Sequence, residues 1–284
     1  MITDKQTNIL YLSDCLKSDY PKFWADFEVA LKSSGVQYLF LEKTKEIWAK
    51  DFMPVQTAKE KFIQFTYSPD YLWDTLEDQK TIAQSDTFCE QIGIKTIKSD
   101  IVLEGGNIVE SDNKVILTSK IFPENARYSE TALTKELEKI LETQVVIIPW
   151  YPNDVVGHSN CWIRFLDDDH IIISEFYTQK TNFFTYARAG LRNLGLKIIE
   201  IPFTNQRFLK SDIDIRGSYI NYLQVGKTIF LPQYELPTDE PAIRKMEEIF
   251  SDCDIVPVLS SEIAAEGGAL GCLGWNIHQP SKNQ

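Results

Sequence analysis

The feature that most constrains the fold is a repeated order of predicted secondary structure, in which two strands are followed by a helix and a further strand. This order recurs at a spacing of roughly 50 to 60 residues. Short apolar runs bounded by turn residues predict strands over residues 8–12, 36–41, 61–67, 145–149, 161–166, 170–174, 197–202, 219–223, 227–231 and 254–259. Apolar residues three and four apart predict helices over residues 22–33, 71–92, 129–142, 182–194 and 241–250. Because no proline-rich linker or low-complexity segment divides the chain, we expect one α/β domain spanning residues 1–284.

The composition supports a folded domain and limits its partners. Hydrophobic residues make up 43% of the 284 residues and aromatic residues 12%, which is enough to form a packed core. The formal net charge of -12 opposes binding to nucleic acid or to an anionic membrane. The same charge suits a small cationic substrate, although many acidic proteins carry their charge only for solubility.

The cysteines and the N-terminal residues indicate the compartment. Residues 1–6 lack the basic and apolar regions of a signal peptide, and no apolar run reaches the length of a membrane span. The five cysteines are scattered and include no CxxC pair, which is neither a disulfide framework nor a common zinc motif. We therefore expect a protein of the reducing cytoplasm.

Two residues could carry the chemistry. His158 precedes the predicted strand over residues 161–166, and a histidine at the mouth of a strand can reach a cleft while the strand fixes its position. Cys272 lies in a glycine-rich segment, residues 266–274, whose backbone can pass close to a ligand and expose the sulfur. The pair therefore predicts a nucleophile and a base. The alternatives are a structural histidine and a small buried hydrophobic cysteine.

Two carboxylates, Asp51 and Glu104, lie inside apolar regions rather than on polar faces. A buried carboxylate is costly unless it meets a cation, a histidine or backbone donors, so both could belong to a site. Alternatively, Asp51 is a turn residue, and Glu104 belongs to a hairpin with a glycine-rich bulge formed by residues 101–118. A metal site made of His158, Cys161 and Cys272 matches no common zinc spacing, and we expect none.

Four motifs occur in a fixed order along the chain. They are Trp48-Ala49-Lys50-Asp51-Phe52-Met53-Pro54, Glu104-Gly105-Gly106-Asn107, Gly157-His158-Ser159-Asn160 with Arg164-Phe165, and Gly267-Gly268-Ala269-Leu270-Gly271-Cys272. Together they resemble the agmatine deiminase and bacterial peptidylarginine deiminase family of the pentein, or guanidine-modifying, superfamily. The resemblance covers residues 48–278. It implies a five-bladed α/β propeller of ββαβ units around a central cleft.

The resemblance also implies a mechanism and the residues that perform it. Cys272 would attack the guanidinium carbon and form a covalent thioether, with His158 as general acid and base. Glu104 would pair with His158 and with substrate nitrogens. Asp51, with Trp48 and the residue at position 160, would bind the substrate. No metal or organic cofactor is expected, and the substrate is a cationic or ureido small molecule or a peptidyl group.

The chain departs from the family pattern within these motifs. The family's acid after Gly-His-x is Asn160 here, and the loss of a charge-assisted hydrogen bond costs roughly 1.5 to 3 kcal/mol. The other departures are Lys50 for an arginine, Ala269 for a glycine, Gly271 for a histidine or asparagine, and Gly274 for a hydroxyl residue. The retained Cys272 and His158 favour a deiminase-type hydrolase acting on a guanidine C–N bond. Asn160 and Gly271 favour the alternative, an inactive pentein that binds a ligand or a protein.

Overall fold

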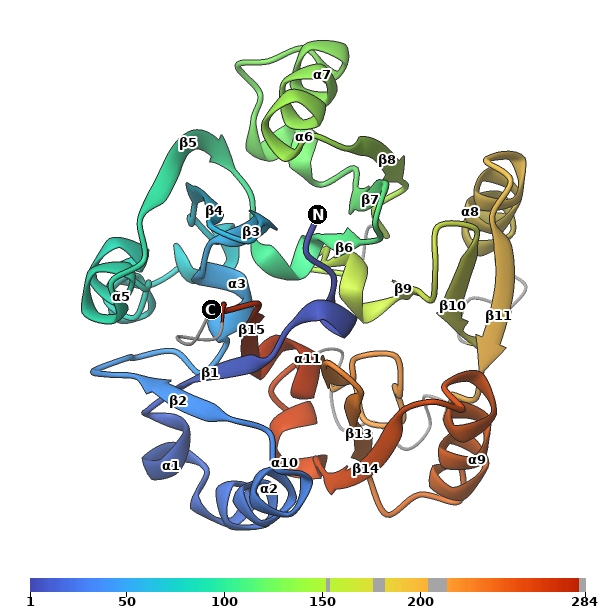
Figure 1. Cartoon of the computed structure of the whole chain (residues 1–284). Helices are drawn as coiled ribbons and strands as arrows, with labels where there is room; N and C mark the ends of the chain where they lie inside the picture. Colours follow the sequence, from blue (N-terminus) through green and yellow to red (C-terminus); the bar gives the residue numbers. More distant parts are fainter. Residues whose placement is uncertain (152–153, 176–181, 204–213, 281–284) are drawn as a thin grey trace.

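Five small sheets are arranged in a ring in this computed structural model, with helices on the outside of the ring (Figure 1). The structure describes residues 1–151, 154–175, 182–203 and 214–280. Each sheet has three strands, of which the first and second pair antiparallel and the second and third pair parallel. A parallel pair needs a crossover connection, which the intervening helix supplies, so each sheet is one ββαβ unit.

Four of the sheets are each built from three strands that are consecutive in the sequence. They contain β3 (Val55–Ala58), β4 (Lys61–Thr66) and β5 (Thr96–Val102); β6 (Val109–Glu110), β7 (Lys114–Thr118) and β8 (Gln144–Ile148); β9 (Ile163–Phe165), β10 (His170–Ser174) and β11 (Lys197–Ile201); and β12 (Leu223–Val225), β13 (Thr228–Gln233) and β14 (Asp254–Leu259). The first strand of each unit lies toward the centre of the ring, as β3, β6 and β9 show in Figure 1.

The fifth sheet joins the two ends of the chain. It contains β15 (Gly274–Ile277), β1 (Ile9–Ser13) and β2 (Tyr38–Leu41), with Ile9 opposite Ile277 in the antiparallel pair. This pairing closes the ring. The sequence predicted no strand after residue 259, because β15 is only four residues long and directly follows the glycine-rich segment.

The crossover helices present apolar faces to the sheets. They are α2 (Pro21–Ser34), α5 (Ser85–Ile92), α7 (Glu130–Leu141), α8 (Asn182–Asn193) and α9 (Asp239–Ile249). In α2, Pro21 occupies the first turn, and Gly35 ends the helix at a φ of 72°, a left-handed conformation that glycine adopts without strain. In α7, Ser129 caps the helix by accepting a hydrogen bond from the Ala132 amide.

Two predicted elements, a helix and a strand, are wrong in part. Residues 71–92 are not one helix but η2 (Asp70–Leu72), α4 (Leu76–Gln79) and α5, because Thr75 caps a new helix and Trp73 and Leu76 are exposed. The predicted strand at 219–223 is reduced to β12, which begins at Leu223.

The predicted hairpin over residues 101–118 is divided between two sheets. Its first part belongs to β5, which pairs with β4, while β6 and β7 form the hairpin. The glycine pair lies where the chain passes from one sheet to the next. This passage places Glu104 near the centre of the ring.

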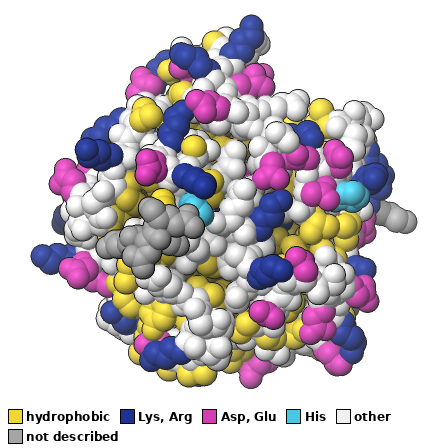
Figure 2. All heavy atoms as spheres, in the orientation of Figure 1, with side chains coloured by type: hydrophobic (Ala, Val, Ile, Leu, Met, Phe, Trp, Pro, Cys, Tyr) yellow, Lys and Arg dark blue, Asp and Glu magenta, His cyan; other side chains and the backbone are white. Residues whose placement is uncertain are grey.

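The surface carries mixed charges. Acidic and basic side chains are interspersed with apolar ones over the face on which the N-terminal residues lie (Figure 2). Every helix in the described ranges is too short or too polar to span a bilayer. All five cysteines are unpaired.

Candidate active site

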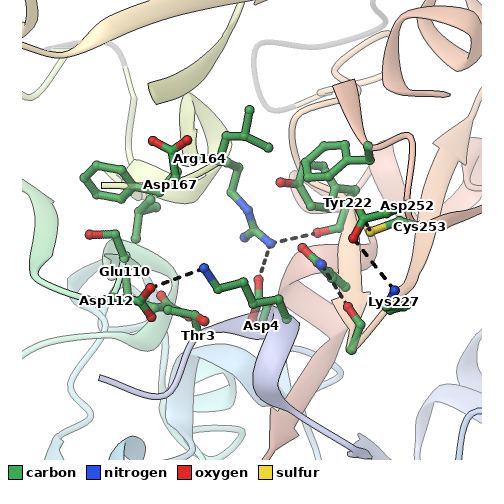
Figure 3. A pocket seen from close by; sticks show the side chains of 18 residues that line it. Thr3, Asp4, Glu110, Asp112, Arg164, Asp167, Tyr222, Lys227, Asp252 and Cys253 are labelled. Carbon is green, nitrogen blue, oxygen red and sulfur yellow. Dashed lines mark hydrogen bonds and ion pairs between the residues drawn. The ribbon is translucent and has the colours of Figure 1, made fainter. Parts of the chain in front are cut away.

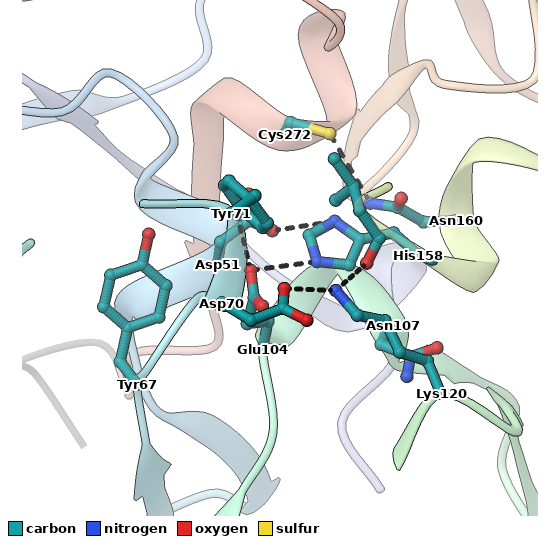
Figure 4. A network of polar contacts seen from close by, with 12 residues as sticks. Asp51, Tyr67, Asp70, Tyr71, Glu104, Asn107, Lys120, His158, Asn160 and Cys272 are labelled. Carbon is teal, nitrogen blue, oxygen red and sulfur yellow. Dashed lines mark hydrogen bonds and ion pairs between the residues drawn. The ribbon is translucent and has the colours of Figure 1, made fainter. Parts of the chain in front are cut away.

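The candidate site is built from the segments that enter the innermost strands. Asp51 lies on α3 (Ala49–Phe52) before β3, and Glu104 precedes η3 (Gly105–Asn107) before β6. His158 precedes η4 (Ser159–Cys161) before β9, and Cys272 lies on α11 (Leu270–Leu273) before β15. The ring brings these four positions together although 221 residues separate Asp51 from Cys272. Three residues after each of these two, Trp275 Nε1 donates to Pro54 O at 2.7 Å. Figure 4 shows the cluster.

His158 lies between the two carboxylates. Its Nε2 is 3.1 Å from Glu104 Oε2, and its Nδ1 is 3.6 Å from Asp51 Oδ1. Only 3% of the side chain is exposed. Burial opposes a positive charge here, but Asp51 and Glu104 more than compensate and raise the pKa of His158 to about 10. The ring is therefore an imidazolium at neutral pH and can donate a proton.

One carboxylate oxygen of Asp51 has no hydrogen-bond partner. Within the described part of the chain, its Oδ1 is one of three buried side-chain oxygen or nitrogen atoms without a hydrogen-bond partner. Burial raises the pKa of Asp51 well above its ordinary value, and the positive His158 partly offsets this. A buried, unpaired carboxylate oxygen is costly, and a ligand rich in N–H donors would satisfy it.

Tyr71 is a site residue that the sequence analysis missed. Its hydroxyl donates to Glu104 Oε2 at 2.8 Å, the same oxygen that accepts from His158 (Figure 4). No sequence signal identified it, because Tyr71 lies at the start of a region predicted to be a continuous helix. Both Tyr71 and His158 thus bond to Glu104 Oε2, and neither donates to Glu104 Oε1.

Cys272 is surrounded by neutral donors. Asn221 Nδ2 lies 3.3 Å from its sulfur and Asn160 Nδ2 lies 3.8 Å away, and Cys161 forms a further hydrogen bond to it. The bond from Cys161 is the strongest influence on this thiol. With the positive His158 and the Asn221 bond, it outweighs burial and lowers the pKa of Cys272 to about 6. The sulfur is therefore a thiolate near neutral pH.

The other predicted substrate residues, Asn160 and Trp48, lie beside Cys272 or its segment. Asn160 is fully buried, and its Oδ1 lies 3.5 Å from Cys161 Sγ. Its amide thus contacts the two sulfurs. Trp48 packs against the backbone of the cysteine segment, because a β-carbon on Gly268 would lie 2.5 Å from the indole ring. The glycine therefore permits this close approach.

Lys50 and Arg164 face away from the cluster. Lys50 Nζ lies 4.0 Å from Glu110 Oε1, and Arg164 Nη2 donates to Asp4 Oδ2 at 2.6 Å. Both Glu110 and Arg164 line a cavity of about 290 Å³ on the side of the N-terminal residues (Figure 3). Asp51, Glu104, His158 and Cys272 do not line it. The cavity is thus separate from the candidate site.

A metal ion is a possible alternative occupant of the cluster. Atoms of Asp51, Glu104 and His158 lie within 4.8 Å of one another, a spacing at which one ion could contact all three. A ligating histidine needs a free nitrogen lone pair. Asp51 and Glu104 raise the pKa of His158, so a proton competes with a metal ion for its nitrogens at neutral pH. The charges favour a hydrogen-bonding organic ligand instead.

The order of these residues along the chain fits one known family. Residues 17–278 match the Porphyromonas-type peptidyl-arginine deiminases. The chain belongs to this family. The predicted relationship is therefore confirmed, and with it the assignment to the guanidine-modifying deiminases at the family level.

Curated relatives of this deiminase family are distant and longer than the matched region. The agmatine deiminase of Pseudomonas aeruginosa (strain LESB58) is 23% identical over 218 residues, which is 64% of this chain and 59% of the relative. The agmatine deiminase of Stutzerimonas stutzeri is 25% identical over 208 residues, 61% of this chain and 56% of the relative. The chain thus spans less than two thirds of the length of these relatives.

Solved deiminase structures share the fold. The substrate-bound agmatine deiminase of C. jejuni has a TM-score of 0.79 at 17% identity, over 99% of this chain and 96% of that one. The agmatine deiminase of Enterococcus faecalis has a TM-score of 0.77 at 17% identity, over 97% and 94%. DDAH from Pseudomonas aeruginosa, complexed with citrulline, has a TM-score of 0.58 at 14% identity, over 95% and 99%. The predicted five-bladed α/β propeller of the penteins is confirmed.

Proposed function

We propose that this protein is a cysteine-dependent hydrolase that cleaves a C–N bond of a guanidine compound, of the agmatine or peptidyl-arginine type, and releases ammonia. One observation carries the proposal. The Cys272 thiol, with its pKa lowered to about 6, shares a buried cluster with the His158 imidazolium and with Asp51 Oδ1, which has no hydrogen-bond partner. These are a nucleophile, a proton donor and an acceptor for N–H groups.

The first step forms a thioether. Asp51 Oδ1 and Glu104 accept hydrogen bonds from the guanidinium and hold its plane toward the sulfur. The Cys272 thiolate attacks the central carbon, and an electron pair of the C–N π system moves to nitrogen. His158 donates its proton to one nitrogen, the C–N bond breaks, and ammonia leaves. An amidino-thioether on Cys272 remains.

The second step returns the enzyme to its starting state. His158, now neutral, accepts a proton from water, and the oxygen attacks the thioether carbon. The C–S bond breaks, the electron pair returns to sulfur, and a ureido product leaves. Overall, guanidinium and water give the ureido compound and ammonium, so both protons and electrons balance without an oxidant or reductant.

Asn160 bears on the choice of substrate. Asn160 carries an amide where the family pattern has a carboxylate. This amide contacts Cys272 and Cys161. Among the described residues of the cluster, Asp51 and Glu104 then supply the negative charge for substrate binding. We therefore expect weak binding of simple cationic guanidines, at a cost of about one to two decades in affinity relative to a site with a third carboxylate.

Ammonia release tests the proposal. Agmatine, arginine, a peptidyl-arginine and small guanidines are offered to the protein and to Cys272→Ala. We expect at least one compound to release ammonia with the unmodified protein and none with the variant. If no compound does so while Cys272 reacts normally with an alkylating agent, the hydrolase proposal fails. The pentein would then be a ligand-binding module, the function that the neutral Asn160 favours.

A further inference from the structure

Two of the five cysteines lie together at the candidate site, although they come from different units of the ring. Cys161 ends η4, the short helix that follows His158, and Cys272 lies on α11. Cys161 forms a hydrogen bond to the Cys272 sulfur. A disulfide requires two sulfurs that can approach to about 2 Å, and two hydrogen-bonded thiols start close to that arrangement.

Two amide side chains each contact both sulfurs. Asn221 Nδ2 lies 3.3 Å from Cys272 Sγ and 3.6 Å from Cys161 Sγ. Asn160 Nδ2 lies 3.8 Å from Cys272 Sγ, a contact that Figure 4 shows, and Asn160 Oδ1 lies 3.5 Å from Cys161 Sγ. Both asparagines are fully buried. The two sulfurs therefore share the same rigid neighbours, which keep them together.

The two thiols differ in charge. Cys272 is a thiolate near neutral pH, because the hydrogen bond from Cys161 and the positive His158 lower its pKa to about 6. The same hydrogen bond, together with burial and the negative charge of Cys272, holds the pKa of Cys161 well above its usual range. Oxidation of Cys272 to a neutral sulfenic acid removes that charge. Cys161 then becomes easier to deprotonate, at the point where a second nucleophile is needed.

The other three cysteines lack this reactivity. Burial raises the pKa of Cys15 to about 11 and that of Cys89 to about 12, and it also raises the pKa of Cys253. Peroxides react with thiolates rather than with thiols, so oxidation should begin at Cys272. Cys161 is the cysteine in contact with it.

We propose that Cys161 and Cys272 form a reversible redox pair, in which a hydroperoxide oxidises Cys272 and Cys161 then closes a disulfide that blocks the nucleophile. The inference rests on the reactive thiol of the proposed hydrolase and not on the identity of its substrate. The disulfide protects Cys272 from further, irreversible oxidation, and a dithiol restores the nucleophile by thiol–disulfide exchange.

The oxidation takes two steps. The Cys272 thiolate attacks one oxygen of the hydroperoxide, the O–O bond breaks, and the leaving oxygen takes a proton from His158. The Cys161 sulfur then attacks the sulfur of the Cys272 sulfenic acid, the S–O bond breaks, and hydroxide leaves as water with the proton of Cys161. Each sulfur gives up one electron and the peroxide accepts both. The hydroperoxide is therefore the one oxidant required, and solvent returns the proton to His158.

Peptide mapping after treatment with hydrogen peroxide tests the pair. The folded protein is oxidised at pH 7, free thiols are blocked with iodoacetamide, and the digest is analysed by mass spectrometry without reduction. We expect a cross-linked pair of peptides that contain Cys161 and Cys272, and loss of Cys272 alkylation. Dithiothreitol should then restore alkylation of Cys272 to its level before oxidation.

Two variants provide the comparison. Cys161→Ser keeps a hydrogen-bond donor but cannot form the disulfide, so Cys272 should proceed to the sulfinic acid, which dithiothreitol does not reverse. Cys253→Ser removes a cysteine that lines the separate cavity, and it should form the same cross-link as the unmodified protein. Thermal unfolding verifies that both variants fold.

Sulfinic acid at Cys272 of the unmodified protein, without the cross-linked peptides, would overturn the inference even if Cys161→Ser does not fold. A disulfide from Cys272 to Cys15, Cys89 or Cys253 would also overturn it. Detection by mass needs no turnover. The cross-link in a protein whose reduced form releases no ammonia from any guanidine would reject the hydrolase proposal and support the redox pair, whereas ammonia release without the cross-link would do the opposite.

Discussion

Gly106 and His158 are so close that a β-carbon on Gly106 would lie 2.4 Å from His158 Nδ1. The same carbon would lie 2.4 Å from Asp51 Oδ1. The backbone of Gly106, which has no side chain, thus borders the gap between the His158 imidazole and the Asp51 carboxylate. Glycine is needed at position 106 for this close approach and not for its backbone conformation, because its φ is not positive.

Gly106→Ala is therefore expected to displace His158 or Asp51 and to lower kcat/KM at least a hundredfold, as a displacement of about 1 Å does at a reacting centre. Steady-state ammonia release measures the effect. Gly190→Ala on α8 adds the same methyl in open space and should change nothing. Near-normal activity of a folded Gly106→Ala protein would mean that the His158–Asp51 spacing has no part in the reaction.

The pH dependence of activity follows from the two opposite pKa shifts. The pKa of Cys272 is lowered to about 6 and that of His158 is raised to about 10, so the thiolate and the imidazolium coexist between these values. Activity needs both forms. We expect kcat/KM to rise as the pH increases through about 6, to stay level, and to fall through about 10 as His158 loses its proton. A profile that rises only near pH 9 would contradict a lowered thiol pKa.

Cys161 supplies the strongest single influence on the Cys272 thiol. A hydrogen bond donated to a thiolate lowers its pKa, so removing the donor must raise it. Cys161→Ala should slow alkylation of Cys272 about tenfold at pH 6 and leave the rate at pH 9 nearly unchanged. Cys253→Ala is the control, since Cys253 lines the separate cavity of about 290 Å³. Equal rates at pH 6 in both variants would exclude this hydrogen bond as a cause.

The repeated element order allowed an α/β domain of ββαβ units to be predicted, because each unit shows its own apolar periodicity in the sequence. Closure into a five-bladed ring was implied only by the resemblance to the deiminase family and could not be predicted from the local periodicity. The pairing of Ile9 with Ile277 depends on the rotation that five units add together, and no local pattern encodes that sum. Likewise, residues 71–92 have a helical apolar pattern, but Trp73 and Leu76 are exposed, and only the last eight residues form the crossover helix α5.

The site could be predicted where a residue type was unusual in its surroundings. Asp51 and Glu104 are costly in apolar segments, and the structure brings both to His158. Asn221 and Tyr71 gave no such signal. Asn221 stands between Ile220 and Tyr222 in an apparent strand, where an asparagine can simply face solvent. Its contact with Cys272 appears only when the β12 segment reaches the centre.

Lys120 stabilises the loop that carries His158. Its Nζ donates to Val155 O at 2.9 Å, to Val156 O at 3.0 Å and to Asp70 Oδ1 at 2.9 Å, and the side chain is almost fully buried. Lys120→Met leaves two carbonyls without this donor, and we expect a loss of about 3 kcal/mol in the free energy of unfolding. Urea denaturation measures it. Lys245→Met, at an exposed pair, should cost less than about 0.5 kcal/mol, and equal effects would contradict a special role for Lys120.

Asn160→Asp tests how the site binds its substrate. The amide now donates to Cys272 at 3.8 Å, and a carboxylate of the same shape would instead accept from a guanidinium. We expect kcat/KM for cationic guanidines to rise roughly tenfold to a hundredfold, the value of one charge-assisted hydrogen bond.

The same change should raise the pKa of Cys272 in the free protein, because a negative charge beside the sulfur disfavours the thiolate. Bound guanidinium would neutralise that charge. The variant should therefore be alkylated more slowly at pH 6 by neutral iodoacetamide, yet turn over cationic substrates faster at pH 8. If the folded Asn160→Asp variant shows no increase in kcat/KM for any guanidine, the side chain at position 160 acts on the Cys272 sulfur and not on the substrate.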